Sequence, residues 1–409
     1  MKIRSITYFF NPGWPINQEK VAEAGKFLAQ AKAAYAAEGY EVQTTRVATV
    51  PFPVILGEAL IGLTPRMTQK LSAAIKAQGI DYAALGPAMP EVMESYELIP
   101  DAILLSENVF FSGEMATPQK GIIFPAVRAC AEVILRNAAL KADGFANLRF
   151  AALANVGPGG PFFPAAYADS DAPSFSLALE SADLAVTAFG EAASLDEGRK
   201  AFTAALNAHA ARLTAIANAL KYQFSLKFNG LDFSTATFPG EDCSLGAALE
   251  KIGAPKAGMH GSLAAAALLT ESMDRADYLR VGFNGLMMAA LEDSTLAARA
   301  AAGTLTIKDL LLYSAVCGAG LDTLPLPGDV TLEALTALLM DISALALRLN
   351  KPLTARLMPI PGKKAGDETN FNFAYFANSR VMALESAGLG PLFGAEGNLT
   401  LKSRYSERQ

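Results

Sequence analysis

The chain has 409 residues, of which 52% are hydrophobic and 18% are charged, and its formal net charge at pH 7 is −6. This much apolar sequence excludes a disordered or fibrous protein and is enough for a large buried core. The acidic balance and the lack of any Lys/Arg run exclude the basic surface that nucleic acid requires. No uncharged run reaches the roughly 18–20 residues of a transmembrane helix, so we expect no membrane partner.

The cysteine content indicates a reducing environment. Cys130, Cys243 and Cys317 are far apart in sequence, and they form neither a disulfide framework nor a CxxC metal pair. The first apolar run ends at the NPG of residues 11–13, which makes it too short for the core of a secretory signal. We therefore expect a cytoplasmic protein.

Short apolar runs typical of strands alternate along the chain with longer helical stretches. In chain order, the expected elements are a strand at residues 3–10, a helix at 17–39, a strand at 42–47, a helix at 66–77, strands at 81–85, 102–105 and 109–111, a helix at 118–140, strands at 148–154 and 184–189, a helix at 196–226 and a strand at 227–233. Helices beginning near residues 244, 262 and 285 follow, then helices at 307–315 and 331–350 and a strand at 353–359. This alternation favours a parallel sheet with helices outside it, open or closed into a barrel. No linker divides the chain, so we expect one compact α/β domain over residues 1–409.

In a parallel α/β protein the ligand site lies at the carboxyl ends of the strands, so the loops that follow strands are the places to search. The first such loop is NVGPGGPFFP at residues 155–164, where Asn155 and the backbone of Gly159 could bind an anion. A structural corner packed by two phenylalanines explains the same residues equally well. The GFNG segment at residues 282–285 adds Asn284 as a ligand-binding candidate.

A second loop follows the strand at residues 227–233. In it, Glu241 could act as a general base, and Cys243 near a helix N-terminus could act as a nucleophile. The alternative is that the acids of this loop favour the helix N-terminus electrostatically and that the cysteine is a small buried hydrophobic residue.

A third loop, GAGLDTLPLPGD at residues 318–329, carries two acids. Asp322 and Asp329 are candidate ligands of a hard divalent cation such as Mg, Mn or Ca, and Asp322 could also abstract a proton. The acids Glu292 and Asp293 are expected at an exposed helix turn.

A fourth loop, at residues 359–370, contains PGKKAGD. Lys363 and Lys364 could hold a carboxylate or a phosphate, while Asp367 could bind the divalent cation or act in catalysis. A solvated surface loop is the alternative. His260, in the glycine-flanked GMHG, is the candidate imidazole acid or base. The absence of HExxH and GxSxG motifs disfavours a zinc site and a serine hydrolase.

Several of these strings together resemble a known family. They are PFFPAAY at 161–167, FNGLDFSTATFPGED at 228–242, LEDSTLAAR at 291–299, GLDTLPLPGD at 320–329 and LTARLMPIPGKKAGD at 353–367. On these strings the chain resembles the DUF711 family, which is related to the UPF0210 proteins. The resemblance implies a helix-rich β/α barrel similar to the pyruvate formate-lyase-like fold, assembled as a homodimer. Glycyl-radical chemistry is not expected, because RVGF at 280–283 lacks one residue of the RVxG-aromatic motif and lies far from the C-terminus.

The leading hypothesis is an enzyme that acts on a small anionic metabolite by hydrolysis, elimination or isomerisation at the loops that follow the strands. The alternative is a non-catalytic, amino-acid-linked sensor or binding protein, which needs the same anion-binding loops but no acid/base pair.

Overall fold

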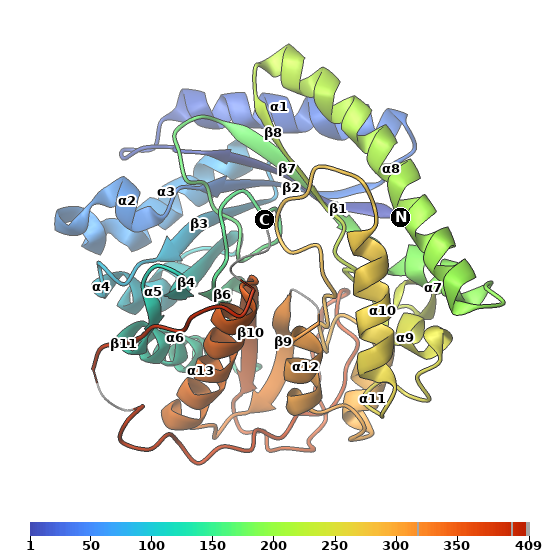
Figure 1. The fold of residues 1–409 in the computed structure, drawn as a ribbon. Helices are drawn as coiled ribbons and strands as arrows, with labels where there is room; N and C mark the ends of the chain where they lie inside the picture. The colour runs from blue at the N-terminus through green and yellow to red at the C-terminus, as the bar shows by residue number, and fades with distance from the viewer. Residues whose placement is uncertain (317–318, 394–395, 406–409) are drawn as a thin grey trace.

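The computed structural model describes residues 1–316, 319–393 and 396–405, so Cys317 and Gly318 lie outside the described residues. The fold is mixed α/β, with helices arranged around a large curved central sheet (Figure 1). Along its path the sheet contains, in spatial order, β8 (Lys227–Asp232), β7 (Ser174–Glu180), β1 (Lys2–Phe10), β2 (Val42–Thr49), β3 (Tyr82–Ala88), β4 (Val109–Thr117), β6 (Phe150–Ala154), β10 (Leu353–Ile360) and β9 (Gly320–Pro327). The short strands β5 (Gly121–Ile123) and β11 (Asn398–Leu399) extend it beside β4.

The helices form the outer layer of the structure. They are α1 (Gln18–Ala37), α2 (Phe52–Leu56), α3 (Thr64–Ala77), α4 (Glu94–Glu97), α5 (Ile99–Leu104), α6 (Phe124–Ala138), α7 (Ala182–Gly190), α8 (Leu195–Phe224), α9 (Leu245–Ile252), α10 (Ser262–Asp274), α11 (Ser294–Ala301), α12 (Ile307–Ser314) and α13 (Leu332–Leu349). In residues 1–316, 319–393 and 396–405, short 3-10 helices lie at Glu58–Leu63, Phe145–Arg149 and Glu241–Cys243. Within the described residues, every helix is too short or too polar to span a lipid bilayer.

Most expected elements are confirmed to within a few residues, but several assignments are wrong. Residues 102–105 lie in and just after helix α5, and residues 184–189 belong to helix α7, although both were expected as strands. Strand β7 lies where no element was expected, and β9 lies in the expected loop at residues 318–329. No helix begins near residue 285, since residues 282–293 form an irregular segment before α11.

The expected barrel is not confirmed, because the sheet is open between its edge strands β8 and β9. Residues 280–289, which lead into and include part of this irregular segment, contact both edge strands through single β-bridges. Arg280 pairs with Leu231 of β8, and Ala289 pairs with Asp322 of β9. Residues 280–289 therefore span the gap between the two edges without forming a strand.

The strands do not all run in one direction, in contrast to the expected parallel sheet. Strands β1, β2, β3, β4 and β6 are parallel to their neighbours in this group. Strand β7, with β8 parallel to it, runs antiparallel to β1, and β10, with β9 parallel to it, runs antiparallel to β6. The carboxyl ends of the strands, and the loops that follow them, therefore lie at two opposite ends of the sheet.

The two faces of the sheet are covered differently. Alternate residues of each strand point to opposite faces; Tyr8 and Phe10 pack in the large core beneath the helices, while Phe9 packs with Ala48 and Ala84 on the inner face. The alanines there leave room for the loop that follows β6, and Phe163 of that loop packs against this second cluster. The loop therefore lies inside the curve of the sheet.

Candidate functional site

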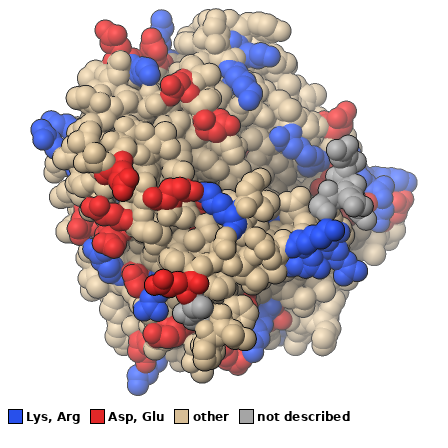
Figure 2. Space-filling model, turned by 60° about the vertical axis from the view of Figure 1, so that its left-hand side comes forward, with Lys and Arg blue, Asp and Glu red and all other residues tan. Residues whose placement is uncertain are grey.

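Most charged side chains are at the surface, where Figure 2 shows Lys, Arg, Asp and Glu in small groups separated by uncharged surface. In the described part of the chain, the charged residues classed as buried are Arg46, Glu180, Asp232, Glu292, Asp293 and Arg356. Burial of a charge is costly unless partners compensate it, so this small set marks where the structure departs from ordinary packing.

Four of these residues lie in or beside a cavity of about 120 Å³ on the inner face of the sheet. Its lining comes from seven strands and from the loops that cross them: Arg4, Gln43, Thr44, Arg46, Tyr82, Phe110, Leu148, Ala151, Phe162, Phe163, Pro164, Ala165, Ala236, Thr237, Phe283, Met287, Ala289, Glu292, Asp322, Thr354, Arg356, Phe373 and Tyr375. The cavity is thus built by the central sheet itself.

β-Bulges direct two charged side chains toward this cavity. In the pairing of β1 with β7, Ile3 faces Leu179 and Ser5 faces Ala178, so Arg4 is an extra residue. In the pairing of β9 with β10, Asp322 and Thr323 together face the single residue Arg356. Bulges re-aim side chains in this way. The second one requires Thr323 to adopt a φ of 42°, which is unusual for a β-branched residue.

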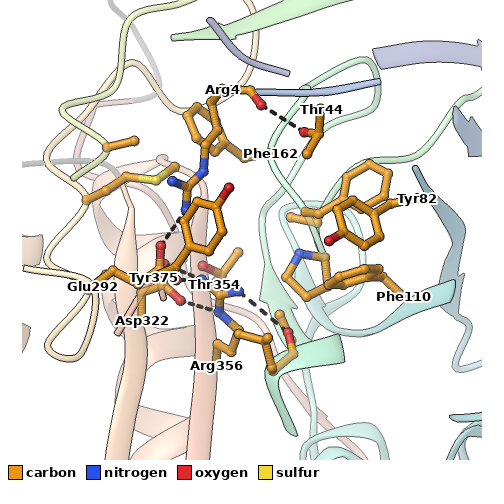
Figure 3. Close-up of a pocket in the computed structure, with 18 of the residues that line it drawn as sticks. Arg4, Thr44, Tyr82, Phe110, Phe162, Glu292, Asp322, Thr354, Arg356 and Tyr375 are labelled. Carbon is orange, nitrogen blue, oxygen red and sulfur yellow. Dashed lines mark hydrogen bonds and ion pairs between the residues drawn. The ribbon is translucent and has the colours of Figure 1, made fainter. Parts of the chain in front are cut away.

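The charged side chains form a continuous chain of ion pairs along one wall (Figure 3). Arg4 donates to Glu180 at 2.8 Å and to Glu292 at 2.6 Å. Glu292 also accepts from Arg356 at 2.8 Å, and Arg356 donates from Nε and Nη2 to both oxygens of Asp322 at 2.5 and 2.9 Å. Glu292 therefore joins two guanidinium groups that would otherwise be separate.

Burial dominates the electrostatics of this wall. It raises the pKa values of the Asp322 and Glu180 carboxyl groups, although Arg356 and Arg4 respectively oppose that shift. For Arg356, burial lowers the pKa, but attraction to Asp322 and Glu292 outweighs it and the pKa rises. The pKa of Arg4 is raised as well, so both guanidinium groups of this wall stay charged.

Arg46, on β2, differs from the other two arginines. Among the residues that the structure describes, no carboxylate pairs with it, and its Nε donates to Thr44 Oγ1 at 2.9 Å. Its guanidinium lies 4.9 Å from the ring centroid of Phe163 and 5.9 Å from that of Tyr82. Burial, followed by repulsion from Arg4, lowers the pKa of Arg46 to about 9. Arg46 is therefore a buried cation without a carboxylate partner among the described residues.

This arrangement predicts that Arg46 destabilises the unliganded protein. Replacing it with methionine, which keeps the unbranched stem of the side chain but removes the charged guanidinium, is expected to raise the free energy of unfolding by about 1–4 kcal/mol. Above pH 9 the folded state loses the Arg46 proton before the unfolded state does, so the cost of the buried charge declines. The advantage of the variant should therefore narrow above pH 9. Urea unfolding at pH 7 and pH 10 measures both effects, and a less stable variant at pH 7 would contradict them.

Of the residues expected to form the site, Asp322 lines the cavity. Asn155 and Gly159 lie in the loop that enters the inner face of the sheet. The Asn155 side chain and the Gly159 amide, however, hydrogen-bond to other residues of the protein. Asn155 Nδ2 donates to Asn350 Oδ1 at 3.3 Å, and the Gly159 amide donates to the Tyr167 carbonyl at 2.8 Å. The same loop contributes to the cavity through its phenylalanines at 162 and 163.

Asn284 holds the irregular segment in place. Its Oδ1 accepts hydrogen bonds from the Phe233 amide at 3.0 Å and from the Tyr278 hydroxyl at 2.8 Å. The buried Asp232 accepts from the amides of Phe283 and Asn284 at 2.7 and 2.9 Å. These contacts explain the FNGLD and GFNG strings as a structural pair that fixes residues 280–289 across the gap in the sheet.

The remaining expected residues lie in loops after strands of the opposite direction or in outer turns. Glu241, His260, Asp329, Lys364 and Asp367 are exposed, and Lys363 is partly exposed. Lys363 Nζ donates to the Glu368 carbonyl at 2.6 Å, and Asp367 accepts from the Lys364 amide at 2.7 Å, so PGKKAGD forms a turn closed on itself. Within the described residues, no three His, Cys, Asp or Glu side chains are grouped to hold a metal ion; Asp322 is thus separated from Asp329 and Asp367.

Cys243 is not activated by its position before α9. Burial and the neighbouring Asp242 raise the pKa of its thiol to about 11. At pH 8 such a thiol contains about 100-fold less thiolate than one with a pKa near 9, so we expect iodoacetamide to label Cys243 about 100-fold more slowly than an ordinary exposed cysteine. Peptide mass spectrometry over a pH series measures this, and rapid labelling at pH 8 would show that the thiolate is stabilised after all.

The sequence did not identify Arg4, Glu292 and Arg356, which form most of the ion-paired wall, or Arg46, which also lines the cavity. Arg4 and Arg356 lie within largely apolar strands, KIRSITYFF and LTARLMPI, and Arg46 lies within VQTTRVAT, which is more polar but mostly buried. A charge inside such a run is rarely tolerated unless it has a purpose. That interruption was the available signal, and Glu292 was assigned instead to an exposed turn although it is only 6% exposed.

A curved mixed sheet with a charged cavity on its inner face defines an α/β protein with an internal ligand-sized pocket. The chain belongs to the family described as Uncharacterised ACR (DUF711), whose model matches residues 1–377, a span that includes every residue lining the cavity. The family resemblance carried by the sequence strings is therefore confirmed.

Relatives from distant organisms are called UPF0210 proteins. One from Pyrobaculum aerophilum is 31% identical over 296 residues, which cover 69% of this chain and 64% of that relative, so the match spans less than two thirds of its length. One from Pyrobaculum islandicum is 28% identical over 369 residues, covering 85% and 79% of the two chains. One from Neisseria meningitidis serogroup A is 26% identical over 375 residues, covering 86% and 81%.

Proposed function

We propose that this protein binds a small organic anion in the cavity on the inner face of the sheet, with the anionic group on Arg46. The observation that supports this proposal is the buried Arg46 guanidinium, which has no carboxylate partner among the described residues. An anion there would offset the cost of the buried charge, and a guanidinium offers two parallel donors to a carboxylate. Arg4 and Arg356 are already neutralised by Glu180, Glu292 and Asp322.

An enzymatic role is the second candidate, and Asp322 is the residue that favours it. Its carboxyl group faces the same cavity as Arg46, and burial raises its pKa, as a general acid or base acting near neutral pH requires. Proton transfer to or from an anion held by Arg46 would suit isomerisation, elimination or hydrolysis. Without such turnover, the same pocket would serve a sensor or binding protein.

A thermal-shift panel of small carboxylates, amino acids and phosphorylated metabolites tests the binding proposal. A ligand at about 100 times its dissociation constant should stabilise the protein by about 2.7 kcal/mol. The Arg46→Met variant should lose that response. Arg212→Met is the matched control, because Arg212 also lies over an aromatic ring, 5.0 Å from the Tyr40 centroid, but on the exposed outer helix α8. A response that survives in Arg46→Met would overturn the assignment of the anion to Arg46.

Turnover separates the two roles. Mass spectrometry of a bound ligand incubated with the wild type and with Asp322→Asn should show conversion by the wild type alone if the protein is an enzyme. Including Mg²⁺, Mn²⁺ and Ca²⁺ in the panel tests the expected cation ligands Asp322, Asp329 and Asp367. On the family resemblance alone, we also propose that the protein is a cytoplasmic homodimer. Light scattering tests the dimer.

A further inference from the structure

We infer that the ligand is a monocarboxylate with a flat apolar body of about the size of one benzene ring. This inference rests on the proposed function, since it takes Arg46 as the group that binds the anion. It excludes inorganic phosphate, sugar phosphates and sugar acids as the preferred ligands.

The balance of charge in the cavity favours a single negative charge on the ligand. The charged side chains that line the cavity are three guanidinium groups, from Arg4, Arg46 and Arg356, and two carboxylates, from Glu292 and Asp322. Both carboxylates pair with Arg4 or Arg356. Arg46 is the cavity cation that this set leaves over. A second negative charge on the ligand would find no further unpaired cation among these lining residues, and Glu292 and Asp322 would repel it.

The threonine and glutamine side chains of the cavity offer little to a hydroxylated ligand. The hydroxyl groups of Thr44, Thr237 and Thr354 donate to the carbonyls of Arg4, Glu292 and Ala319 at 2.8, 3.1 and 3.0 Å. Gln43 Nε2 donates to Glu180 at 3.0 Å. These donors are engaged within the protein, and a sugar would lose hydrogen bonds to water here without regaining them.

The surroundings of Arg46 favour an aromatic or similarly flat body. The Phe110 ring contacts both Tyr82 and Phe163, with both pairs of centroids 5.4 Å apart and the rings nearly perpendicular. Figure 3 shows Tyr82 and Phe110 across the cavity from the wall formed by Arg4, Glu292 and Asp322. A carboxylate on Arg46 would therefore place its body between an aromatic wall and an ionic one.

The size of the cavity limits that body. Its volume of about 120 Å³ is close to that of an engineered apolar cavity of about 150 Å³ that admits benzene. A single ring fits, whereas a nucleotide or a fused polycyclic acid does not.

Isothermal titration calorimetry with benzoate, acetate, inorganic phosphate and benzyl alcohol tests this inference. For the wild type, benzoate is expected to bind at least about tenfold more tightly than acetate, because the ring is removed from water. Arg46→Met should weaken benzoate binding by about 30-fold or more, and Arg212→Met should leave it unchanged. The stability of Arg46→Met, measured separately, ensures that a loss of binding is not a loss of folding.

The outcomes distinguish the two proposals. If acetate or phosphate binds as tightly as benzoate and depends on Arg46, the anion site stands and the apolar body is wrong. If benzyl alcohol binds as tightly as benzoate in both proteins, the pocket is apolar only and the anion site is wrong. If none of the four probes binds the wild type, both proposals are overturned.

Discussion

Replacing Glu292 with alanine is expected to lower the free energy of unfolding by about 3–5 kcal/mol, the usual effect of removing one partner from a buried ion pair. Glu292 accepts from Arg4 at 2.6 Å and from Arg356 at 2.8 Å, and all three side chains are almost wholly removed from solvent. The variant leaves the two guanidinium groups with fewer carboxylates in a medium of low polarity. Urea unfolding followed by circular dichroism measures the loss.

Glu241→Ala is the control for this prediction, because Glu241 is an exposed glutamate in a 3-10 helix. Its removal should change stability by no more than about 0.5 kcal/mol. A loss below about 1 kcal/mol in Glu292→Ala would show that water or neighbouring groups solvate the arginines. The ion-paired wall would then be a surface feature in energetic terms, despite its burial.

Replacing Asp293 with alanine is expected to cost about 2–4 kcal/mol, because this carboxylate caps two helices at once and a single cap contributes about 0.5–2 kcal/mol. Its oxygens accept from the amides of Thr295 and Leu296 in α11, both at 2.9 Å. They also accept from Ser244 Oγ at 2.6 Å and from the Leu245 amide at 2.6 Å at the start of α9. The side chain is fully buried, so water cannot replace it.

Asp309→Ala provides the comparison, since Asp309 takes part in the exposed capping box of a single helix, α12. Denaturant unfolding of both variants should show Asp293→Ala to be the more destabilised by at least about 1 kcal/mol. Equal losses would mean that the contacts of Asp293 with α9 contribute nothing, and that the two helices are held together by packing alone.

The sequence predicted most of the elements, and its errors have physical causes. Residues 182–190 are as apolar as a buried strand, yet they form α7. The strand of this region is the preceding segment SFSLALE, which forms β7. No element was predicted for residues 174–180. Ser176 in fact donates to the Gly159 carbonyl at 2.9 Å, a contact made by a loop that no local pattern reveals.

The candidate site was less predictable, because the alternation of strands and helices predicts strands that all run in one direction. The carboxyl end of β10 points away from that of β6, so Lys363 and Lys364 lie at the opposite edge from Asn155. Charged residues within strands carried the better signal. Arg46 and Arg356 are costly in buried β-sheet, and their side chains face the cavity.

The position of β10 between β6 and β9 has a consequence for the newly made chain. Strand β6 pairs through Ala152 to Ala154 with residues 353 to 355 of β10. One edge of β6 therefore stays unpaired until β10 has been synthesised. At about 5–20 residues per second, a delay of roughly 200 residues lasts about 10–40 s on the ribosome. For that period an apolar strand edge lacks its partner and can pair with another nascent chain. The order of synthesis, more than any local sequence, sets when this protein is most vulnerable to aggregation.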